Sequence, residues 1–497
     1  MNSRKYILAL DEGTTSCRAV LFDAETFDSV AFEQKKLTMI YPTGGWVEQN
    51  AEEIFDRQIE CAEKLINGLS EGDEIVAIGI TNQRESVLIW DKDTGKPLGP
   101  CINWQCRRTA PTCEELKKKG LEKTIKEKTG LGIDAYFSAT KLKWLLDNTP
   151  GARGMARRGR ILSGTIVSYH IYRLTEGKNH ITDITNASRT MLCDITTKQW
   201  DEELLKLFDI PKMLLPSIVE CAGDFGECNI AGRSIKICGC AGDQQASLFG
   251  QACLDKGDMK CTYGTGAFVL ANIGKSPVIS DTPLITTVAY SVGGRARYAL
   301  EGSVFNAGAV VDWLVDIGLL SSAKESEEVM AKARADADVF FIPAFSGLGA
   351  PYWDMNCRAA FLGLTRGSGK SEIVKAAVES IAFRVSEICE LVEKTIGQKI
   401  QVLHADGGAA ANSLLLQFQA DLTGAIIYRS VEKESTALGA AYLAAIGAGI
   451  FTSEWEIAER HKNAGEFIPS KADNIISECK KKWAKAVAAA RCGALNE

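Results

Sequence analysis

An acidic, hydroxyl-rich turn near the N-terminus carries the first residues whose types and spacing suggest chemistry. The stretch 5–23 reads KYILALDEGTTSCRAVLFD, with apolar residues on both sides of the polar run 11–15. This pattern predicts a β-hairpin whose tip is rich in glycine and hydroxyl groups. The N–H groups and hydroxyls of such a tip can bind phosphate oxygens, and Asp11 is placed to bind Mg²⁺. An ordinary hairpin with only local hydrogen bonds is the alternative.

The same design occurs a second time. Residues 260–271 read KCTYGTGAFVLA, again a predicted strand, a turn of glycine and threonine, and a returning strand. Two such turns, one in each half of the chain, indicate duplicated domains that hold one polyphosphate between them.

Polar residues follow two further predicted strands. The run 81–85 follows the apolar stretch 74–80, and open α/β sheets bind ligands where their strands end. Arg84 and Glu85 can hydrogen-bond to vicinal hydroxyls, one as donor and one as acceptor; a solvated turn is the alternative. Asp243 follows a β-like run over 236–242 and can act as a general base toward a hydroxyl, or simply cap the next helix.

Aromatic and glycine residues could complete a binding site. Trp104 can pack against the carbon face of a small polyol, and the Tyr136 hydroxyl can reach the same pocket; core packing is the alternative for both. The glycines of 404–408 (HADGG) would allow a flat base or ribose to approach closely. The glycine- and alanine-rich stretch 302–313 supplies an opposite wall. The polar segment 182–188 is predicted to be a turn without an assigned role.

The length and charge of the chain limit the class of protein. At 497 residues, the chain is expected to form two domains of roughly 250 residues, over 1–249 and 250–497. A net charge of −6 without a basic tract argues against non-specific nucleic-acid binding, and the basic connector 150–160 is predicted to be a solvated loop. The uncharged run 435–453 is interpreted as a buried, closely packed helix and not as a membrane span.

The cysteines and the two ends of the chain suggest a cellular location. None of the 16 cysteines forms a Cys-x-x-Cys pair, so buried reduced thiols are expected. The first predicted strand begins at once, without a cleavable signal, and the last residues are not a peroxisomal address. We therefore expect a cytoplasmic protein, and in addition a homo-oligomer, either a dimer or a tetramer.

These motifs, in this order, resemble the FGGY family of carbohydrate kinases along nearly the whole chain, and among its members those that act on glycerol. The resemblance implies an α/β fold with two ribonuclease-H-like domains, of the actin and hexokinase type, and a catalytic cleft between them. The segments that carry the resemblance are ALDEGTTSCRAVLFD, GITNQRE, NWQCRRT, YFSATKLKW, TDITNASRTML, AGDQQASLFGQ, YGTGAF, PAFSGLGAPYWD, RAAFLGLTRG, ADGGAAAN and STALGAAYLA.

The resemblance also assigns roles to individual positions. Asp243 takes the place of the family's general base, and Asp11 and Asp243 lie near the metal, Mg²⁺ bound with ATP as co-substrate. The positions that match the glycerol ligands and their aromatic walls are Arg84, Glu85, Trp104, Tyr136, Asp243, Gln244 and Phe268. The positions that match the ATP site are Thr14, Thr15, Ser16 and Arg18 in the first turn, Thr265 in the second, and Gly308, Gly408 and Asn412 in the nucleotide pocket.

The expected activity is transfer of the γ-phosphoryl group of ATP to glycerol, giving sn-glycerol 3-phosphate and ADP in glycerol catabolism. Two alternatives stay open. One is another FGGY kinase that acts on a pentulose or a different polyol, and the other is a non-catalytic, actin-like protein that binds a nucleotide and senses a metabolite. An intact Asp243 argues against the sensor.

The chain departs from the family pattern at three places. Glu12 stands where glutamine is common, Asp312 stands where bacterial members often have glutamine, and the segment 228–236 is shorter and poorer in glycine than a loop that binds fructose 1,6-bisphosphate in some of them.

The short 228–236 segment leads to a first prediction. Fructose 1,6-bisphosphate is expected to leave the phosphorylation rate unchanged at physiological concentrations. Initial rates with and without this sugar, measured together with the oligomeric mass by light scattering, check the expectation. Clear inhibition with a change in mass would show that another binding site had been overlooked.

Overall fold

Two sheets of the same design form the centre of the molecule. A computed structural model describes residues 3–279, 282–431 and 434–493. In the first sheet, three antiparallel strands continue into two parallel ones, and a sixth strand pairs at the edge. Its strands, in spatial order, are β13 (Ala222–Ile230), β14 (Arg233–Gly242), β5 (Glu74–Asn82), β1 (Lys5–Glu12), β2 (Ser16–Asp23) and β3 (Ser29–Lys36).

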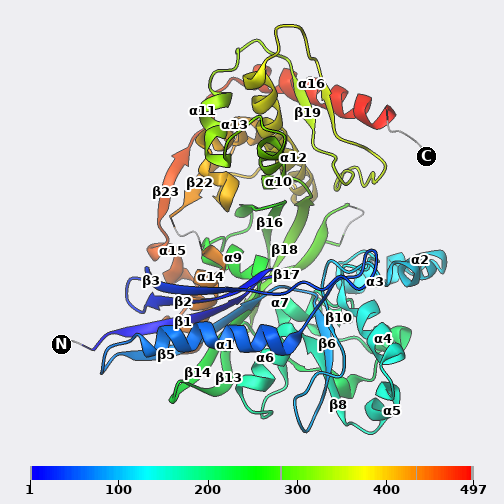
Figure 1. Ribbon diagram of the computed structural model, residues 1–497, viewed down its shortest axis with the longest axis vertical. Coiled ribbons are helices and arrows are strands. Elements are labelled where there is room, and N and C mark those ends of the chain that lie inside the picture. Colours follow the sequence, from blue (N-terminus) through cyan, green and yellow to red (C-terminus); the bar gives the residue numbers. More distant parts are fainter. Residues whose placement is uncertain (1–2, 280–281, 432–433, 494–497) are drawn as a thin grey trace.

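The second sheet repeats the arrangement. Its antiparallel strands β15, β16 and β18 continue into the parallel strands β21 and β22. The spatial order is β17 (Ile285–Val292), β18 (Arg295–Val304), β16 (Ala267–Gly274), β15 (Met259–Tyr263), β21 (Val402–Asp406), β22 (Ile426–Ser430) and β23 (Asn463–Phe467). Figure 1 shows the two sheets stacked along the long axis. The duplicated ribonuclease-H-like fold and both predicted hairpins are therefore confirmed.

A smaller sheet and the helices surround this pair. The small sheet consists of β4 (Glu48–Gln49), β7 (Cys101–Ile102), β6 (Val87–Asp91) and β8 (Ile161–Thr165). The helices used below are α1 (Ala51–Asn67), α4 (Ser138–Asn148), α5 (Ala152–Arg157), α7 (Ile184–Ala187), α9 (Asp243–Gly250), α10 (Gly308–Asp316), α11 (Ser326–Met330), α12 (Lys370–Ile396), α13 (Ser413–Thr423), α14 (Ser435–Gly447), α15 (Trp455–Arg460) and α16 (Asp473–Cys492). Within the described residues, no helix combines the length and the apolar character that a membrane crossing requires.

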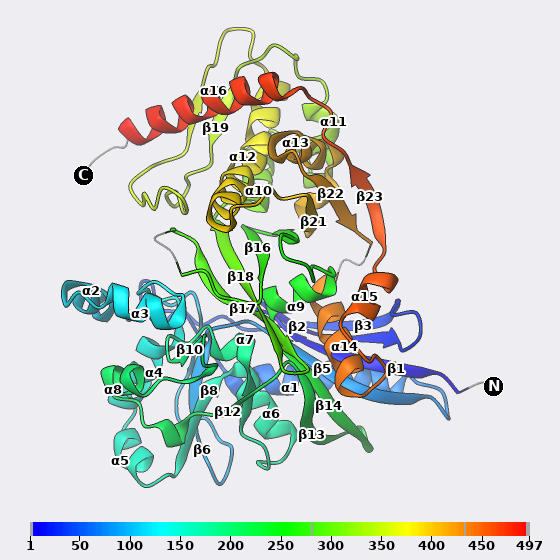
Figure 2. The ribbon, with the colours of Figure 1, turned by 180° about the vertical axis from the view of Figure 1, so that it is seen from behind.

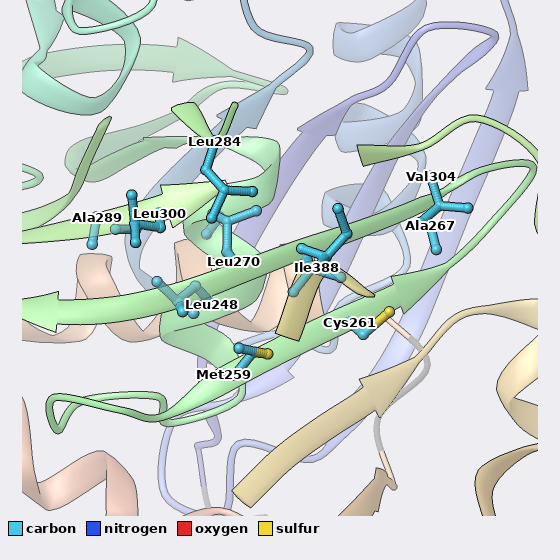
Figure 3. Packing of buried hydrophobic residues seen from close by; sticks show 14 of the residues in the cluster. Leu248, Met259, Cys261, Ala267, Leu270, Leu284, Ala289, Leu300, Val304 and Ile388 are labelled. Carbon is cyan, nitrogen blue, oxygen red and sulfur yellow. The ribbon is translucent and has the colours of Figure 1, made fainter. Parts of the chain in front are cut away.

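The core of the second half lies against its sheet. Met259 of β15, Leu270 of β16 and Leu300 of β18 are fully buried. Leu248 of α9 and Ile388 of α12 join them in the same cluster (Figure 3). Because α9 directly follows β14 of the first sheet and belongs to this cluster, the core continues from one half of the chain to the other. A boundary between residues 249 and 250 stays a prediction.

Helix α14 belongs to the second half of the sequence but packs against β14, β5 and β1 of the first sheet. Figure 2 shows it beside these strands, next to α15. Glycine allows the close approach. A Cβ at Gly79 of β5 would overlap the carbonyl oxygen of Ala440 of α14, and a Cβ at Gly439 of α14 would overlap that of Ala246 of α9, the helix that follows β14. The backbones therefore touch directly. The expected buried, closely packed helix over 435–453 is confirmed for 435–447, whereas residues 448–450 follow the end of the helix and are exposed.

Two local expectations were wrong. The connector 150–160 contains a short helix, α5, because Ala152 and Ala156 lie one turn apart and are both buried. The polar segment 182–188 is not a turn: it contains the end of strand β9 (Ile181–Asp183) and helix α7. All of it is buried, and Asp183 caps α7 by accepting hydrogen bonds from two backbone N–H groups. The cysteines behave as expected, since all 16 are free and only Cys479 and Cys492 are not buried.

The hairpin between β13 and β14 bears on the first prediction. The two strands are joined by Ala231 and Gly232 alone, both in the left-handed region of φ. The segment 228–236 is thus a tight two-residue hairpin.

The α14 contact leads to a second prediction. Gly439→Ala is expected to lower the free energy of unfolding by about 1–3 kcal/mol or more, because the added methyl group overlaps backbone that cannot rotate away. Helix propensity alone would give the opposite sign, since alanine is favoured over glycine by about 1 kcal/mol in a helix. Urea denaturation measures the change. Gly132→Ala, where no atom lies within 4 Å of the added Cβ, is the control. Equal stability of the two variants would contradict the close packing.

Candidate active site

The first predicted phosphate turn is the tip of the β1–β2 hairpin. The Gly13 N–H donates to the Ser16 carbonyl at 3.0 Å, which closes the turn. Thr15 is exposed and Thr14 half-buried, and the Thr14 hydroxyl accepts a hydrogen bond from the Trp104 indole at 2.8 Å. Arg18, on β2, forms ion pairs with Asp11 and with Glu434, which directly precedes α14. The predicted phosphate and polyol residues are therefore joined at this tip.

The second turn is bonded to the start of α10. The Gly308 N–H donates to the Gly264 carbonyl at 2.8 Å, and the Ala307 N–H donates to that of Thr265 at 2.9 Å. A Cβ at Gly308 would come within 2.6 Å of the Gly264 carbonyl, so only glycine allows this approach. The Thr265 side chain is exposed at the tip. The structure thus brings two of the predicted ATP residues, Thr265 and Gly308, together.

The other two predicted nucleotide residues differ in their surroundings. Gly408 is exposed, with open space where a side chain would project, which suits close approach of a flat ligand. Asn412 is buried, and its side chain caps α13 through the Leu415 N–H at 3.0 Å and donates to Ser326 at 3.2 Å. Both polar atoms of Asn412 therefore have protein partners. Asp312 is exposed on α10.

Glu12 lies under the first turn. Its Oε1 accepts a hydrogen bond from Gln83 at 2.6 Å, and the network continues through Gln49 and Asn103. Its Oε2 is buried without a partner. Burial, the largest cause, raises the pKa of Glu12 well above its usual 4.5, against the lowering effect of Gln83. This carboxyl group therefore points into a network of amides, away from solvent.

Arg84 is the centre of a buried charge cluster. Its Nε lies 3.1 Å from Asp243 Oδ1, and its Nη1 donates to Glu301 Oε2 at 2.6 Å and to Gln245 at 3.2 Å. Its Nη2 donates to Glu301 Oε1 at 3.2 Å and to the Tyr136 hydroxyl at 3.4 Å. All six residues from 81 to 86 are buried, so the alternative of a solvated turn is wrong.

Asp243 and Asp11 lie near one another at the ends of β14 and β1. Asp243 is the first residue of α9 and is 31% exposed. The helix cap is Gly242, so simple capping by the Asp243 side chain is wrong. Burial raises the pKa of Asp11 to about 6; Arg18 lowers this pKa, and the Asp243 carboxylate raises it further.

These two carboxylates suit a divalent cation. No group of three or more His, Cys, Asp or Glu residues within the described chain could hold a metal alone. Two carboxylates fit Mg²⁺, which keeps several waters and takes further oxygens from substrate phosphates. The Asp243 carboxylate raises the pKa of Asp11, and a cation between the two carboxylates would reduce this repulsion.

The remaining predicted polyol residues are only partly brought together. The Tyr136 ring, just before α4, packs edge-on against Trp104 at 5.6 Å between centroids. Gln244 accepts a hydrogen bond from the buried Lys260. Phe268 is half-buried on β16, and among the described residues no hydrogen bond or ring contact joins it to Tyr136 or Trp104.

Sequence reasoning missed four residues of this cluster: Arg189, Gln245, Lys260 and Glu301. Arg189 and Gln245 lie within two of the segments that carry the family resemblance, TDITNASRTML and AGDQQASLFGQ. Lys260 and Glu301 lie on strands β15 and β18. A charged residue within an otherwise apolar strand was the available signal for both.

Comparison with protein families decides the family. The N-terminal domain of the FGGY family of carbohydrate kinases matches residues 6–250, and its C-terminal domain matches 259–448. This chain belongs to the FGGY family of carbohydrate kinases.

Individual FGGY proteins match over nearly their full length. The glycerol kinase of Carboxydothermus hydrogenoformans is 48% identical over 494 residues, which cover 98% of this chain and 99% of that protein. The crystal structure of Plasmodium falciparum glycerol kinase with ADP has a TM-score of 0.95 and 36% identity, and covers 100% of this chain and 99% of its own. The gluconate kinase of Lactobacillus acidophilus follows with a TM-score of 0.88, 25% identity and 99% coverage of both chains.

The buried Glu12 of this FGGY chain leads to a third prediction. In the unfolded chain its carboxyl ionises near the usual pKa of 4.5, whereas the folded protein keeps the proton to higher pH. The contribution of neutral Glu12 to the free energy of unfolding is therefore fully present below pH 4.5. It is lost as the pH rises through the pKa that Glu12 has in the folded protein. Glu12→Gln removes this loss, so the variant should gain stability over the parent with rising pH, by at most about 1.4 kcal/mol per pH unit.

Urea denaturation of both proteins between about pH 5 and about pH 9, without nucleotide or metal, measures the difference. Glu71→Gln, at an exposed position, is the control and should follow the parent at every pH. Parallel stability curves for the parent and Glu12→Gln would show that burial does not hold this proton.

Proposed function

We propose that this chain is an ATP-dependent kinase that phosphorylates glycerol to sn-glycerol 3-phosphate. The observation that supports it best is the pairing of Arg84 with Asp243: a partly exposed carboxylate is oriented by a fully buried guanidinium. The relatives named glycerol kinase that match from end to end add weight. In this proposal Arg84, Glu85, Tyr136 and Gln244 bind the polyol, and Trp104 and Phe268 form its walls.

Asp243 is the proposed general base. It takes the proton from the attacking hydroxyl as that oxygen bonds to the γ-phosphorus, while the bond to the bridging oxygen breaks and ADP leaves. The Arg84 Nε contact at 3.1 Å holds one carboxylate oxygen. The second oxygen is then available for the substrate proton, and the side chain is exposed enough for a small hydroxyl to reach it.

The two turns are the proposed phosphate clamps. Thr14, Thr15 and Ser16 in the first turn, with Arg18 behind them, and Thr265 in the second would hold the β- and γ-phosphates in line with the hydroxyl. Gly308, Gly408 and Asn412 would border the nucleotide. Mg²⁺ bound by Asp11 and Asp243 would neutralise the phosphate oxygens.

A coupled assay of ADP release across polyols tests the proposal. Glycerol is expected to give the highest kcat/KM, with xylulose and gluconate as competitors because structurally similar kinases act on such sugars. A higher value for either sugar would establish the alternative of another FGGY kinase. Absence of turnover with all of them, combined with nucleotide binding, would establish the sensor.

Substitution of the base leads to a fourth prediction. Asp243→Asn is expected to lower kcat by about 10²–10⁴-fold, because the amide cannot accept the substrate proton. Binding of glycerol and ATP, measured by calorimetry, should persist, since asparagine keeps the shape and one acceptor. Asp56→Asn, at an exposed position of α1, is the control and should retain full activity. Near-parental turnover in Asp243→Asn would remove Asp243 from the role of base.

A further inference from the structure

Two buried charged side chains, Arg189 and Glu301, lie beside the proposed polyol residues. Arg189 follows α7 in the first half of the chain, and Glu301 lies on β18 of the second sheet. Both are at most 1% exposed. Arg189 Nη2 donates to Glu301 Oε1 at 2.9 Å, so the two form a direct ion pair between the halves.

Each member of this pair also binds one of the two proposed hydroxyl-binding residues. Arg189 Nε donates to Glu85 Oε1 at 2.6 Å. Glu301 accepts from Arg84 through both of its oxygens, at 2.6 and 3.2 Å. A planar guanidinium held by both oxygens of one carboxylate has a fixed orientation. Arg189 and Glu301 thus form the middle of a chain of charges that ends at Glu85 on one side and Arg84 on the other.

The charges in this chain are balanced. Two arginines face two glutamates, so no ion is buried alone, which would be strongly unfavourable. Burial raises the pKa of Glu301, but Arg189 and Arg84 together lower it to about 2. Glu301 is therefore ionised across the physiological range and binds both guanidinium groups as a carboxylate.

The contacts leave little freedom to Arg84 and Glu85. The five N–H donors of Arg84 point toward Asp243, Gln245, Tyr136 and the two oxygens of Glu301. Of these partners, only Glu301 binds the guanidinium through two oxygens, and one of these contacts is the shortest of the five, at 2.6 Å. One oxygen of Glu85 is used by Arg189, which leaves the other for a hydroxyl. The Arg189 guanidinium also stacks near the rings of Tyr136 and Phe137, at 5.6 and 5.4 Å.

We propose that Arg189 and Glu301 are positioning residues of the polyol site: they fix the side chains of Glu85 and Arg84 in the orientation that binds two neighbouring hydroxyls, without contacting the substrate themselves. The inference rests on the proposed polyol kinase function. Because Glu301 comes from the second sheet, the polyol site in the first half is complete only when the second half is docked on it.

The test compares steady-state constants for glycerol and for ATP. Glu301→Gln keeps the shape of the side chain but replaces the carboxylate that holds Arg84. It should raise KM for glycerol by about tenfold or more, the effect of weakening a charge-assisted hydrogen bond, and should change KM for ATP by less than about twofold. Arg189→Lys keeps the charge but cannot bridge two carboxylates. It should therefore also raise KM for glycerol.

A remote buried pair supplies the matched control. Arg384 and Glu387 of α12 form an ion pair of low exposure that contacts the Ala350 carbonyl and Trp483. Glu387→Gln should lower the melting temperature about as much as Glu301→Gln but leave KM for glycerol unchanged. A purely structural role for Glu301 predicts the same kinetic result for both variants.

A double variant separates orientation from charge balance. Glu301→Gln combined with Arg189→Gln removes one charge of each sign, so the buried site stays balanced and should fold. Under the proposal its KM for glycerol stays high, because neither neighbour is oriented any longer. A parental KM for glycerol in folded Glu301→Gln or in the double variant would overturn the positioning role.

Failure of the underlying function has a different signature. If the parent protein does not phosphorylate glycerol, the proposed function is wrong. The positioning role of Arg189 and Glu301 is then tested with xylulose or gluconate, whichever the parent phosphorylates. Protection of the parent and the variants against thermal unfolding by that polyol gives a second readout that does not need turnover. Equal protection of the parent and the double variant would again overturn the positioning role.

Discussion

Burial of the Arg84 guanidinium imposes the strictest condition on this fold. A fully buried guanidinium is stable only when its donors are paired and its charge is opposed. Here the donors are satisfied by residues from three places in the chain: the loop before α4, the start of α9 and strand β18. These elements must meet at one point, and that meeting fixes the first sheet, α9 and the second sheet relative to one another.

The same condition explains the position of Asp243. Its carboxylate lies at the edge of the buried cluster, bonded to Arg84 on one side and 31% exposed on the other. Asp11 and Glu12 are less exposed, and burial raises the pKa of both carboxyl groups. A fully exposed one would have no fixed orientation. The edge of a charge cluster combines access for a small substrate with a defined direction, and proton transfer requires both.

Local sequence patterns predicted the hairpins, the strand ends and the buried helix α14, because alternation of apolar residues and turn chemistry act over a few residues. They could not predict that 81–86 and 182–188 are buried. That outcome depends on partners far away in the sequence, such as Glu301, which is 217 positions from Arg84. Asn412 shows a role that the motif did not predict: its side chain caps α13, while its contact with a nucleotide stays a prediction.

The contact between α14 and the first sheet also constrains how the protein can be made. The glycine-lined surface of β5 and β14 is completed by residues 435–447, which leave the ribosome after most of the chain. Until then that surface and the Arg84 cluster both lack partners from the second half. The N-terminal half therefore cannot reach its final packing until residues 435–447 have been made, although domains often fold in order of their emergence. The nascent chain must keep this apolar surface from aggregating until α14 is released.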